Sequence, residues 1–474
     1  MSMIRERVRR KPAAVLLALL VLVNAGCQTT KTEQANAAKP SAQPNIVIIM
    51  ADDLASSELS CYGGKNLTTH HIDALAKEGM QFNNMYASEA MCVPIRASLF
   101  TGLYPAKHGS YQNHKGVHEN LKSVGHYLGS AGYRVGLTGK DHSTKPATVF
   151  PFEIIDGFEK NCVAKTADYT VDGIRNFVTG SKKPFCLFVM STNPHAPWTV
   201  GDPNEFDPEK LVLPAHWVDT KQTRQHFARY LAEVRQLDNE VGDVMKMLKE
   251  IGQDKNTMVI FLGEQGPQFP GGKWNLWDHG VKSAMIVRHP GHVKPNTKTN
   301  AVTQYEDITP TLVALAGGQP VPGLDGTSFL PVIDGKSQKH RQYAYGIHNN
   351  IPEGPAYPIR AITDGRYKLI LNLTPEANYH IKYMMNPGAA NPTWRTWQEV
   401  AKQNPAAKVL TDRIVHRPAV EFYDTQQDPA ELKNLAKDPA HAEKVNTMTA
   451  ALRQWMQQQG DTGADFDKEF ARHN

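Results

Sequence analysis

Five short apolar runs, each followed by polar or charged residues, constrain the fold of this 474-residue chain more than any other feature. The first run is Asn45 to Met50, and Ala-Asp-Asp follows it directly. Continuous apolar runs of this length are typical of strands that are buried on both faces of a parallel sheet. The other four runs are Tyr133 to Thr138, Phe185 to Ser191, Met258 to Gly263 and Ala284 to Arg288.

Helical patterns separate these runs. They cover Ile72 to Glu78, Leu121 to Ala131, about Arg224 to Ile251, and Ile308 to Ala316. Strands that alternate with helices predict an α/β fold with a large, mostly parallel sheet flanked by helices. Open sheets of this kind build their sites at the carboxyl ends of the strands, so we expect the polar residues there to matter.

The alternation of strand and helix patterns ends after about Gly335. The runs Arg360 to Thr363 and Tyr367 to Asn372 flank Asp364-Gly365, which is a strong hairpin signal. A loop-rich stretch follows, and a helix is expected from about Ala440 to Gln459. We therefore predict a large domain over residues 44–335 and a smaller C-terminal α+β domain over residues 336–474.

The first 27 residues have the pattern of a bacterial export signal. Five basic residues precede an apolar run from Ala13 to Val23, which is too short to span a membrane. Ala-Gly-Cys at the end resembles a lipobox, which would make Cys27 the lipidated first residue of the mature chain. Asn24 departs from that pattern, so simple cleavage near Ala25 is the alternative. Residues 28–43 resemble a flexible tether, and the expected location is the periplasm or the outer membrane.

Charge and cysteine content exclude two other classes of protein. The segment 1–27 carries five basic residues and one acidic residue, hence +4 of the total formal charge of +5. The remaining chain is near +1, and nothing favours nucleic-acid binding. The sparse cysteines, five in all, do not form a disulfide framework.

The segment from Cys92 to Gly102 carries the most chemical information. Pro94 fixes its own φ and is tolerated in a first helical turn, so Cys92 is expected at or just before a helix N-terminus. Unpaired N–H groups and the helix dipole favour an anion there. Arg96 would lie near the same end and can hydrogen-bond that anion. A buried structural cysteine is the alternative interpretation.

This Cys-x-Pro-x-Arg…Thr-Gly segment resembles the signature of type I sulfatases, although Leu103 stands where that family usually has a basic residue. The resemblance implies an alkaline phosphatase-like fold. It also implies that a formylglycine-generating enzyme oxidises Cys92 to formylglycine (3-oxoalanine), whose hydrated aldehyde attacks the sulfur of a sulfate ester.

Two pairs of oxygen ligands follow predicted strands, Asp52-Asp53 and Glu264-Gln265. Adjacent carboxylates repel each other, so a hard cation is their natural partner. With an oxygen at position 92 they form a plausible all-oxygen site for one Ca²⁺ ion, in preference to Mg²⁺. A thiolate is a poor ligand for either ion, which favours a formylglycine there. The family usually has Asp-Asn or Asp-His as its second pair, and solvated loops are the alternative.

By the same resemblance, four further residues contact the sulfate. Lys140 and His142 lie in a Gly-Lys-x-His motif, in which Lys140 binds sulfate and His142 removes a proton to release it. His195, in Pro-His-x-Pro, contacts the sulfate or the leaving oxygen. Lys273 matches another sulfate-binding lysine. Each of these residues taken alone is more often a surface charge or a loop histidine.

The sequence resembles most closely the sulfamidase branch, the N-sulfoglucosamine sulfohydrolases. The resemblance rests on Tyr111-x-x-His114-x-x-Val117-His118, on Val149 to Phe152 and on Pro358 to Arg360. It would place His114 and His118 in the sugar subsite, unless they are plain loop residues. Trp274 and Trp277 suit either stacking on a sugar ring or core packing.

The sequence therefore predicts an exported sulfatase, attached to the membrane only through a lipid anchor, which acts on sulfated oligosaccharides bearing O-sulfate or N-sulfate groups. Two alternatives stay open. The first is a phosphomonoester or phosphodiester hydrolase of the same superfamily. The second is a non-catalytic glycan-binding lipoprotein, suggested by the altered Glu264-Gln265 pair.

Overall fold

The computed structural model describes residues 43–472 except residue 390. The predicted export signal, Cys27 and all but the last residue of the predicted tether lie outside these residues. Among the described residues, no helix is both long enough and apolar enough to cross a membrane.

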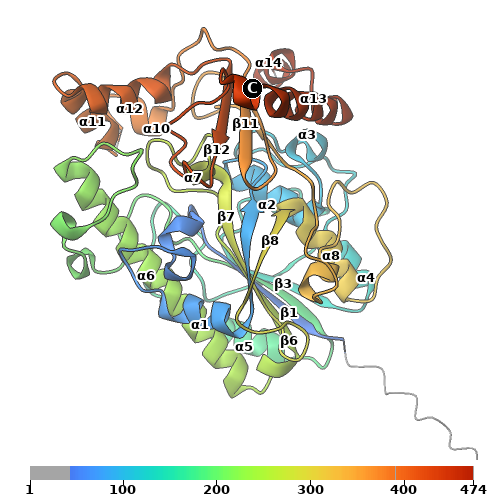
Figure 1. The fold of residues 1–474 in the computed structure, drawn as a ribbon. Helices are drawn as coiled ribbons and strands as arrows, with labels where there is room; N and C mark the ends of the chain where they lie inside the picture. The colour runs from blue at the N-terminus through green and yellow to red at the C-terminus, as the bar shows by residue number, and fades with distance from the viewer. Residues whose placement is uncertain (1–42, 390, 473–474) are drawn as a thin grey trace, which may run out of the picture. The chain divides into compact units, whose positions relative to one another are not determined.

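A large sheet of eight strands forms the centre of this part of the chain (Figure 1). Its order is β4-β3-β5-β1-β6-β7-β2-β8. The strands are β1 Asn45–Met50, β2 Met80–Tyr86, β3 Arg134–Gly139, β4 Glu153–Ile155, β5 Phe185–Met190, β6 Thr257–Leu262, β7 Lys282–Arg288 and β8 Thr297–Gln304. Only β7 runs antiparallel to its two neighbours, β6 and β2. The mostly parallel sheet that the sequence predicts is therefore confirmed.

The central strands are completely buried, as their apolar runs require. Every residue of β1, β5 and β6 is buried, and β1 pairs in parallel with both of the others. All five predicted strands are present. Three more, β2, β4 and β8, were not expected, because β4 is short and both β2 and β8 carry polar residues along their length.

Helices cover the large sheet on both faces (Figure 1). α1 packs against α6 on one side, while α2, α4 and α8 contact one another on the other side. The helices of this region are α1 His70–Glu78, α2 Cys92–Thr101, α3 Pro105–His108, α4 Val124–Ser130, α5 Asp172–Thr179, α6 Lys221–Glu250, α7 Asp278–Val281, α8 Ile308–Leu315 and α9 Leu330–Ile333. The four helices expected from the sequence are all present.

A smaller antiparallel sheet of four strands follows, in the order β12-β11-β10-β9. Its strands are β9 Ala344–His348, β10 Ile359–Thr363, β11 Tyr367–Asn372 and β12 Val420–Asp424. The predicted hairpin is β10 and β11, and Gly365 takes a φ of 91° at its turn. The helices around it are α10 Lys382–Met385, α11 Thr393–Ala401, α12 Pro405–Val415, α13 Ala442–Gln458 and α14 Ala464–Arg472. The domain boundary between residues 335 and 336 stays a prediction.

The strand directions bring five chain segments to one edge of the large sheet. β1, β3, β5 and β6 are parallel to one another, and β2 runs the same way because it is antiparallel to β7, which is itself antiparallel to β6. The segments that follow these strands therefore start at the same edge of the sheet. They contain Asp52, Cys92, Lys140, His195 and Glu264.

Gly139 ends β3 immediately before Lys140, and it has no room for a side chain. Its φ is 84°, and an added Cβ would lie 2.0 Å from the carbonyl oxygen of Met190. We expect Gly139→Ala to lower the free energy of unfolding by about 2–4 kcal/mol, from left-handed strain together with overpacking.

Gly132→Ala is the matched control. Gly132 has a φ of 90° but no atom within 4 Å of an added Cβ, so only the strain of about 1–2 kcal/mol remains. Urea unfolding of both variants measures the difference. Equal losses of stability would contradict the close approach of β3 and β5 at this point.

Candidate active site

Cys92 is the first residue of α2, as the sequence predicts. Its N-cap, Met91, is extended with a φ of −140°, and the helix ends at Gly102 with a φ of 72°. All ten residues of α2 are buried, and Cys92 is 2% exposed. Burial, followed by the nearby Glu264 carboxylate, raises the pKa of the Cys92 thiol. The thiol is therefore protonated at neutral pH and is a poor nucleophile.

Two carboxylates face the Cys92 sulfur. Asp52 Oδ1 lies 3.7 Å from Sγ, and Asp53 Oδ1 lies 3.9 Å from it. His195 approaches from the segment after β5, with Nε2 3.7 Å from Asp53 Oδ2. The ligand atoms of Asp52, Asp53, Cys92 and His195 all lie within 4.8 Å of one another, which is close enough to hold one metal ion.

Glu264 and Gln265 lie at the same place. Glu264 Oε1 accepts a hydrogen bond from Arg96 Nε at 2.5 Å, and its Oε2 accepts from Asp53 N at 3.1 Å. Gln265 Nε2 donates to Asp53 Oδ1 at 2.6 Å and to Cys92 Sγ at 3.3 Å. Glu264 is not one of the four residues whose ligand atoms lie within 4.8 Å of one another, and its carboxylate pairs with Arg96. His195 belongs to that group, although it was not among the predicted ligands.

Three buried cations balance these three carboxylates. Lys140 Nζ donates to Asp52 Oδ2 at 2.5 Å, and Arg96 lies 3.6 Å from the other oxygen of Asp52. Lys273 Nζ lies 2.8 Å from Asp53 Oδ1 and 3.1 Å from Cys92 Sγ. Burial opposes ionisation of Asp52, yet Lys140, His195 and Arg96 hold its pKa well below the ordinary value.

The donor set fits a hard divalent cation. Burial raises the pKa of Glu264 to about 8, and the neighbouring Arg96 only partly offsets this effect. Gln265 Oε1 is buried without a hydrogen-bond partner among the described residues. Three carboxylates and a free amide oxygen are the ligands that Ca²⁺ and Mg²⁺ prefer. Only the sulfur of Cys92 does not suit such an ion.

Backbone strain is concentrated here. Of the six non-glycine residues with positive φ in the described part of the chain, four belong to this region: Asp53, His114, Glu264 and Trp274. Left-handed conformations are unfavourable for glutamate and tryptophan and persist only where the surroundings impose them. Tyr305 helps to impose that of Glu264, because its hydroxyl accepts a hydrogen bond from Glu264 N at 2.8 Å.

Two histidines of the predicted set are neutral at pH 7. Burial and the neighbouring Lys140 lower the pKa of His142 to about 3, and burial lowers that of His195 to about 4. Nδ1 of each ring is buried and has no hydrogen-bond partner in the part of the chain that the structure describes. Both imidazoles are therefore free to bond a ligand.

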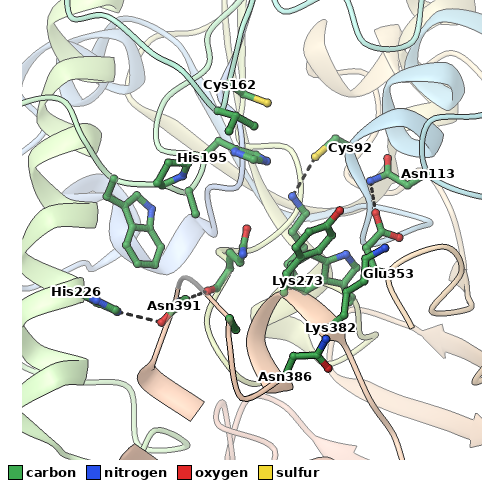
Figure 2. Close-up of a pocket in the computed structure, with 18 of the residues that line it drawn as sticks. Cys92, Asn113, Cys162, His195, His226, Lys273, Glu353, Lys382, Asn386 and Asn391 are labelled. Atoms are coloured by element: carbon green, nitrogen blue, oxygen red, sulfur yellow. Dashed lines mark hydrogen bonds between the residues drawn. The ribbon is translucent and has the colours of Figure 1, made fainter. Parts of the chain in front are cut away.

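A cavity of about 930 Å³ opens above Cys92 (Figure 2). Cys92, Lys273, His142, His195 and His114 line it. Arg96 and Lys140 are buried beneath these residues and act on the cavity through Asp52 and Glu264.

The structure separates the two histidines that were predicted for a sugar subsite. His114 lines the cavity with 58% of its side chain exposed. His118 is also exposed but does not line the cavity, and its ring instead lies against Gly109. Trp274 is at the cavity wall. Trp277 is a core residue that packs between the guanidinium groups of Arg413 and Arg417, each 4.1 Å away.

Sequence reasoning missed several cavity residues. Asn113 lies inside a motif that was used only for its histidine, and Trp198 follows the predicted Pro-His-x-Pro. Several come from α6 or from segments after residue 350 that carry no motif: His226, Arg229, Glu353, Lys382, Tyr383, Asn386 and Asn391. Only the three-dimensional structure brings these side chains to the site.

Residues 44–318 match the protein family described as Sulfatase, which is more than half of the sequence. The chain belongs to the sulfatase family. Residues 272–388 also match the family described as N-sulphoglucosamine sulphohydrolase, C-terminal. This segment contributes Lys273, Trp274, Glu353 and Lys382 to the cavity.

Two relatives match this sulfatase over most of their length. An "Ulvan-active sulfatase" of Formosa agariphila is 30% identical over 474 residues, which cover 95% of this chain and 89% of the relative. The human "N-sulphoglucosamine sulphohydrolase" is 27% identical over 87% of this chain and 89% of its own. A solved structure of a protein with its substrate D-glucosamine-2-N,6-O-disulfate shares the fold, with a TM-score of 0.68 and 20% identity over 90% of this chain and 99% of that chain. These matches support a sulfatase rather than a non-catalytic lipoprotein.

His108 supports α2 in its neutral form. Ser110 N donates to its Nδ1 at 3.1 Å, and its Nε2 lies 3.2 Å from Ser98 Oγ of α2. Burial lowers the pKa of His108 to about 3. Between pH 6.5 and 3 the unfolded chain binds a proton that the folded sulfatase does not, so this residue makes stability fall as the pH falls.

We expect His108→Gln to remove this contribution, which is at most about 1.4 kcal/mol for each pH unit in that window. Urea unfolding between pH 4 and 7 measures it. His70→Gln, at an exposed position, is the control and keeps the wild-type slope. An unchanged slope in His108→Gln would show that His108 is not buried as a neutral ring.

Proposed function

We propose that this sulfatase removes sulfate groups from saccharides, as N-sulfoglucosamine or O-sulfate esters, with a formylglycine at position 92 and one Ca²⁺ ion. The observation that carries the proposal is the position of Cys92, at the first turn of α2 and at the floor of the cavity, between three carboxylates and three cations.

The surroundings of Cys92 favour an oxygen there. A protonated, buried thiol offers neither a nucleophile nor a ligand for a hard ion. Formylglycine would supply a hydroxyl nucleophile at the same place. The Cys-x-Pro-x-Arg segment that a formylglycine-generating enzyme would recognise becomes the buried α2, so modification before folding is the consistent order.

Asp52, Asp53, Glu264 and Gln265 would hold the cation together with the oxygen at position 92. A bound divalent ion supplies positive charge that lowers the pKa of an attached hydroxyl and polarises the sulfate. Larger, flexible ligand spheres suit Ca²⁺ better than Mg²⁺, and the longer Glu-Gln pair is consistent with such a sphere.

The chain's own residues bind the sulfate and handle protons. Lys273 Nζ lies at the cavity floor, where it can donate to a sulfate oxygen. Arg96 and Lys140 fix the orientation of Asp52 and Glu264. His195 is placed to hydrogen-bond the leaving oxygen or nitrogen, and a bound anion raises its pKa toward that of an effective acid. His142 Nδ1 has no hydrogen-bond partner among the described residues, so it would be available to accept a proton.

The remainder of the cavity suits a saccharide. Asn113, Asn386 and Asn391 offer amide groups to sugar hydroxyls, and Trp274 stacks on Tyr383 with ring centroids 6.2 Å apart. Both matched relatives carry names that refer to sulfated saccharides. The site's chemistry alone does not separate a sulfate ester from a phosphate ester, and family membership favours the sulfate.

We also propose that the protein is exported and attached to the outer membrane through a lipid on Cys27. Support comes only from the basic and apolar pattern of residues 1–27 and the Ala-Gly-Cys that ends it. Fractionation of native cells that express Cys27→Ser should then find the protein in the soluble periplasmic fraction. An unchanged membrane association would contradict the anchor.

Release of free sulfate from heparin-derived and algal oligosaccharides tests the activity. We expect release from at least one of these saccharides and faster turnover of nitrophenyl sulfate than of nitrophenyl phosphate. Lys273→Ala should lower kcat/KM about 100-fold, as the loss of a donor to developing charge does, whereas Lys77→Ala, at an exposed lysine, should not. A strong preference for the phosphate would reject the proposed function.

Calcium binding is tested separately from activity. Saturation at about 100 times Kd should stabilise the folded chain by about 2.7 kcal/mol, observed as a rise in Tm, and Mg²⁺ should be less effective. Asp53→Asn should abolish the rise, and Asp168→Asn, at an exposed aspartate, should retain it. An equal rise in Asp53→Asn would place the ion elsewhere.

A further inference from the structure

Glu353 is a buried carboxylate at the wall of the cavity that the proposed chemistry does not use. It lies in the loop between β9 and β10 and is 1% exposed. Asn113 Nδ2 donates to its Oε1 at 2.7 Å, but its Oε2 is buried without a hydrogen-bond partner among the described residues. Because an unsatisfied buried carboxylate oxygen is costly, it points to a ligand that donates a hydrogen bond.

The backbone holds this carboxylate in place. The carbonyl oxygen of Glu353 accepts from Lys382 N at 2.8 Å, and Gly354 N donates to Asn350 O at 2.7 Å. An added Cβ on Gly354 would lie 2.1 Å from His380 O, so the loop is packed tightly against the segment before α10. The backbone of Glu353 is therefore fixed, and the hydrogen bond from Asn113 holds its side chain.

Asn113 connects Glu353 to the nucleophile helix. Val93 N, in the first turn of α2, donates to Asn113 Oδ1 at 3.4 Å, and Asn113 in turn donates to Glu353. Figure 2 shows Cys92, Asn113 and Glu353 on the same side of the cavity. A group bound by the free oxygen of Glu353 thus belongs to the sugar that carries the sulfate undergoing cleavage, not to a distant part of an oligosaccharide.

The negative charge of Glu353 defines which group fits. His114 Nε2 lies 3.9 Å from its Oε1, and Lys382 Nζ donates to Pro352 O. A carboxylate only accepts hydrogen bonds, as do a sulfate and a uronate, so a second anion at this position would have no proton to share. A hydroxyl group supplies that proton and fits the free oxygen.

We propose that Glu353 is a specificity residue that binds a free hydroxyl of the sulfated sugar and excludes a second anionic group from that position. The inference rests on the proposed function, because it takes a sulfated saccharide as the ligand. It predicts that the sulfatase acts on sugars whose sulfate neighbours an unsubstituted hydroxyl, and that over-sulfated sugars are cleaved only after another sulfatase has removed the second group.

The test uses full-length wild type, Glu353→Ala and the isosteric Glu353→Gln. The substrates are the saccharide with the highest kcat/KM in the release assay and derivatives of it in which each hydroxyl of the sulfated sugar is singly replaced by hydrogen or singly sulfated. Binding of the same sugars to Cys92→Ala and to Cys92→Ala/Glu353→Gln is measured by calorimetry. Glu376→Gln, at an exposed glutamate, is the control variant.

We expect Glu353→Ala to lower kcat/KM about 10- to 100-fold, the effect of losing a hydrogen bond to a charged group. On one deoxy derivative, Glu353→Ala and wild type should have almost the same kcat/KM, because the hydroxyl that Glu353 binds is already missing from that substrate. Sulfation of that same hydroxyl should block wild type, and Glu353→Gln should relieve the block at least about 10-fold. Calorimetry should show the same pattern, and Glu376→Gln should behave as wild type.

This inference would be overturned if Glu353→Ala lowered kcat/KM equally for all derivatives, or if Glu353→Gln did not restore cleavage of the sulfated derivative. Either result would leave the proposed function intact. Wild type that hydrolyses nitrophenyl sulfate but neither cleaves nor binds any saccharide would overturn both. A fall in Tm of Glu353→Gln equal to that of Glu353→Ala, with unchanged discrimination, would assign Glu353 a structural role only.

Discussion

The structure of this site depends on a balance of buried charge around Cys92. Asp52, Asp53 and Glu264 face Arg96, Lys140 and Lys273, and none of these six side chains is more than 3% exposed. Burying one such charge without a partner costs several kcal/mol, so each of them constrains the others. Cys92 lies among them with a neutral thiol. This arrangement is suited to a hard cation and an anion, and the sulfur of Cys92 is a poor ligand for such a cation.

The sheet explains how residues so far apart in sequence form such a compact set. Five strands that run in one direction end at the same edge, and each delivers a short polar segment there. The backbone is closely packed at this edge, where Asp52 N bonds to Asn193 O and Lys140 N bonds to Met190 O. The positive φ of Asp53 and Glu264 turns both side chains at the ends of their strands. The scaffold thus fixes the charges before any ligand arrives.

Much of this arrangement follows from the sequence, and the rest does not for definite reasons. The apolar runs predict β1, β3, β5 and β6 because buried parallel strands need no alternation, and Pro94 predicts the start of α2. β8 was missed because Thr297–Gln304 is polar over most of its length, although it pairs in parallel with β2. His118 was predicted beside the substrate from the resemblance to the sulfamidase segment, but it does not line the cavity and its ring lies against Gly109. Glu353 was missed because no local pattern marks it, and the fold brings it to the cavity beside Asn113, 240 positions away in the sequence.

We propose that an oxygen, and not a sulfur, occupies position 92 when this sulfatase is active. Mass analysis of the peptide containing Cys92, from active enzyme purified from its native host, tests it most directly. We expect an aldehyde in place of the thiol, in a proportion that rises with specific activity. A fully active preparation with an intact thiol at this position would contradict it.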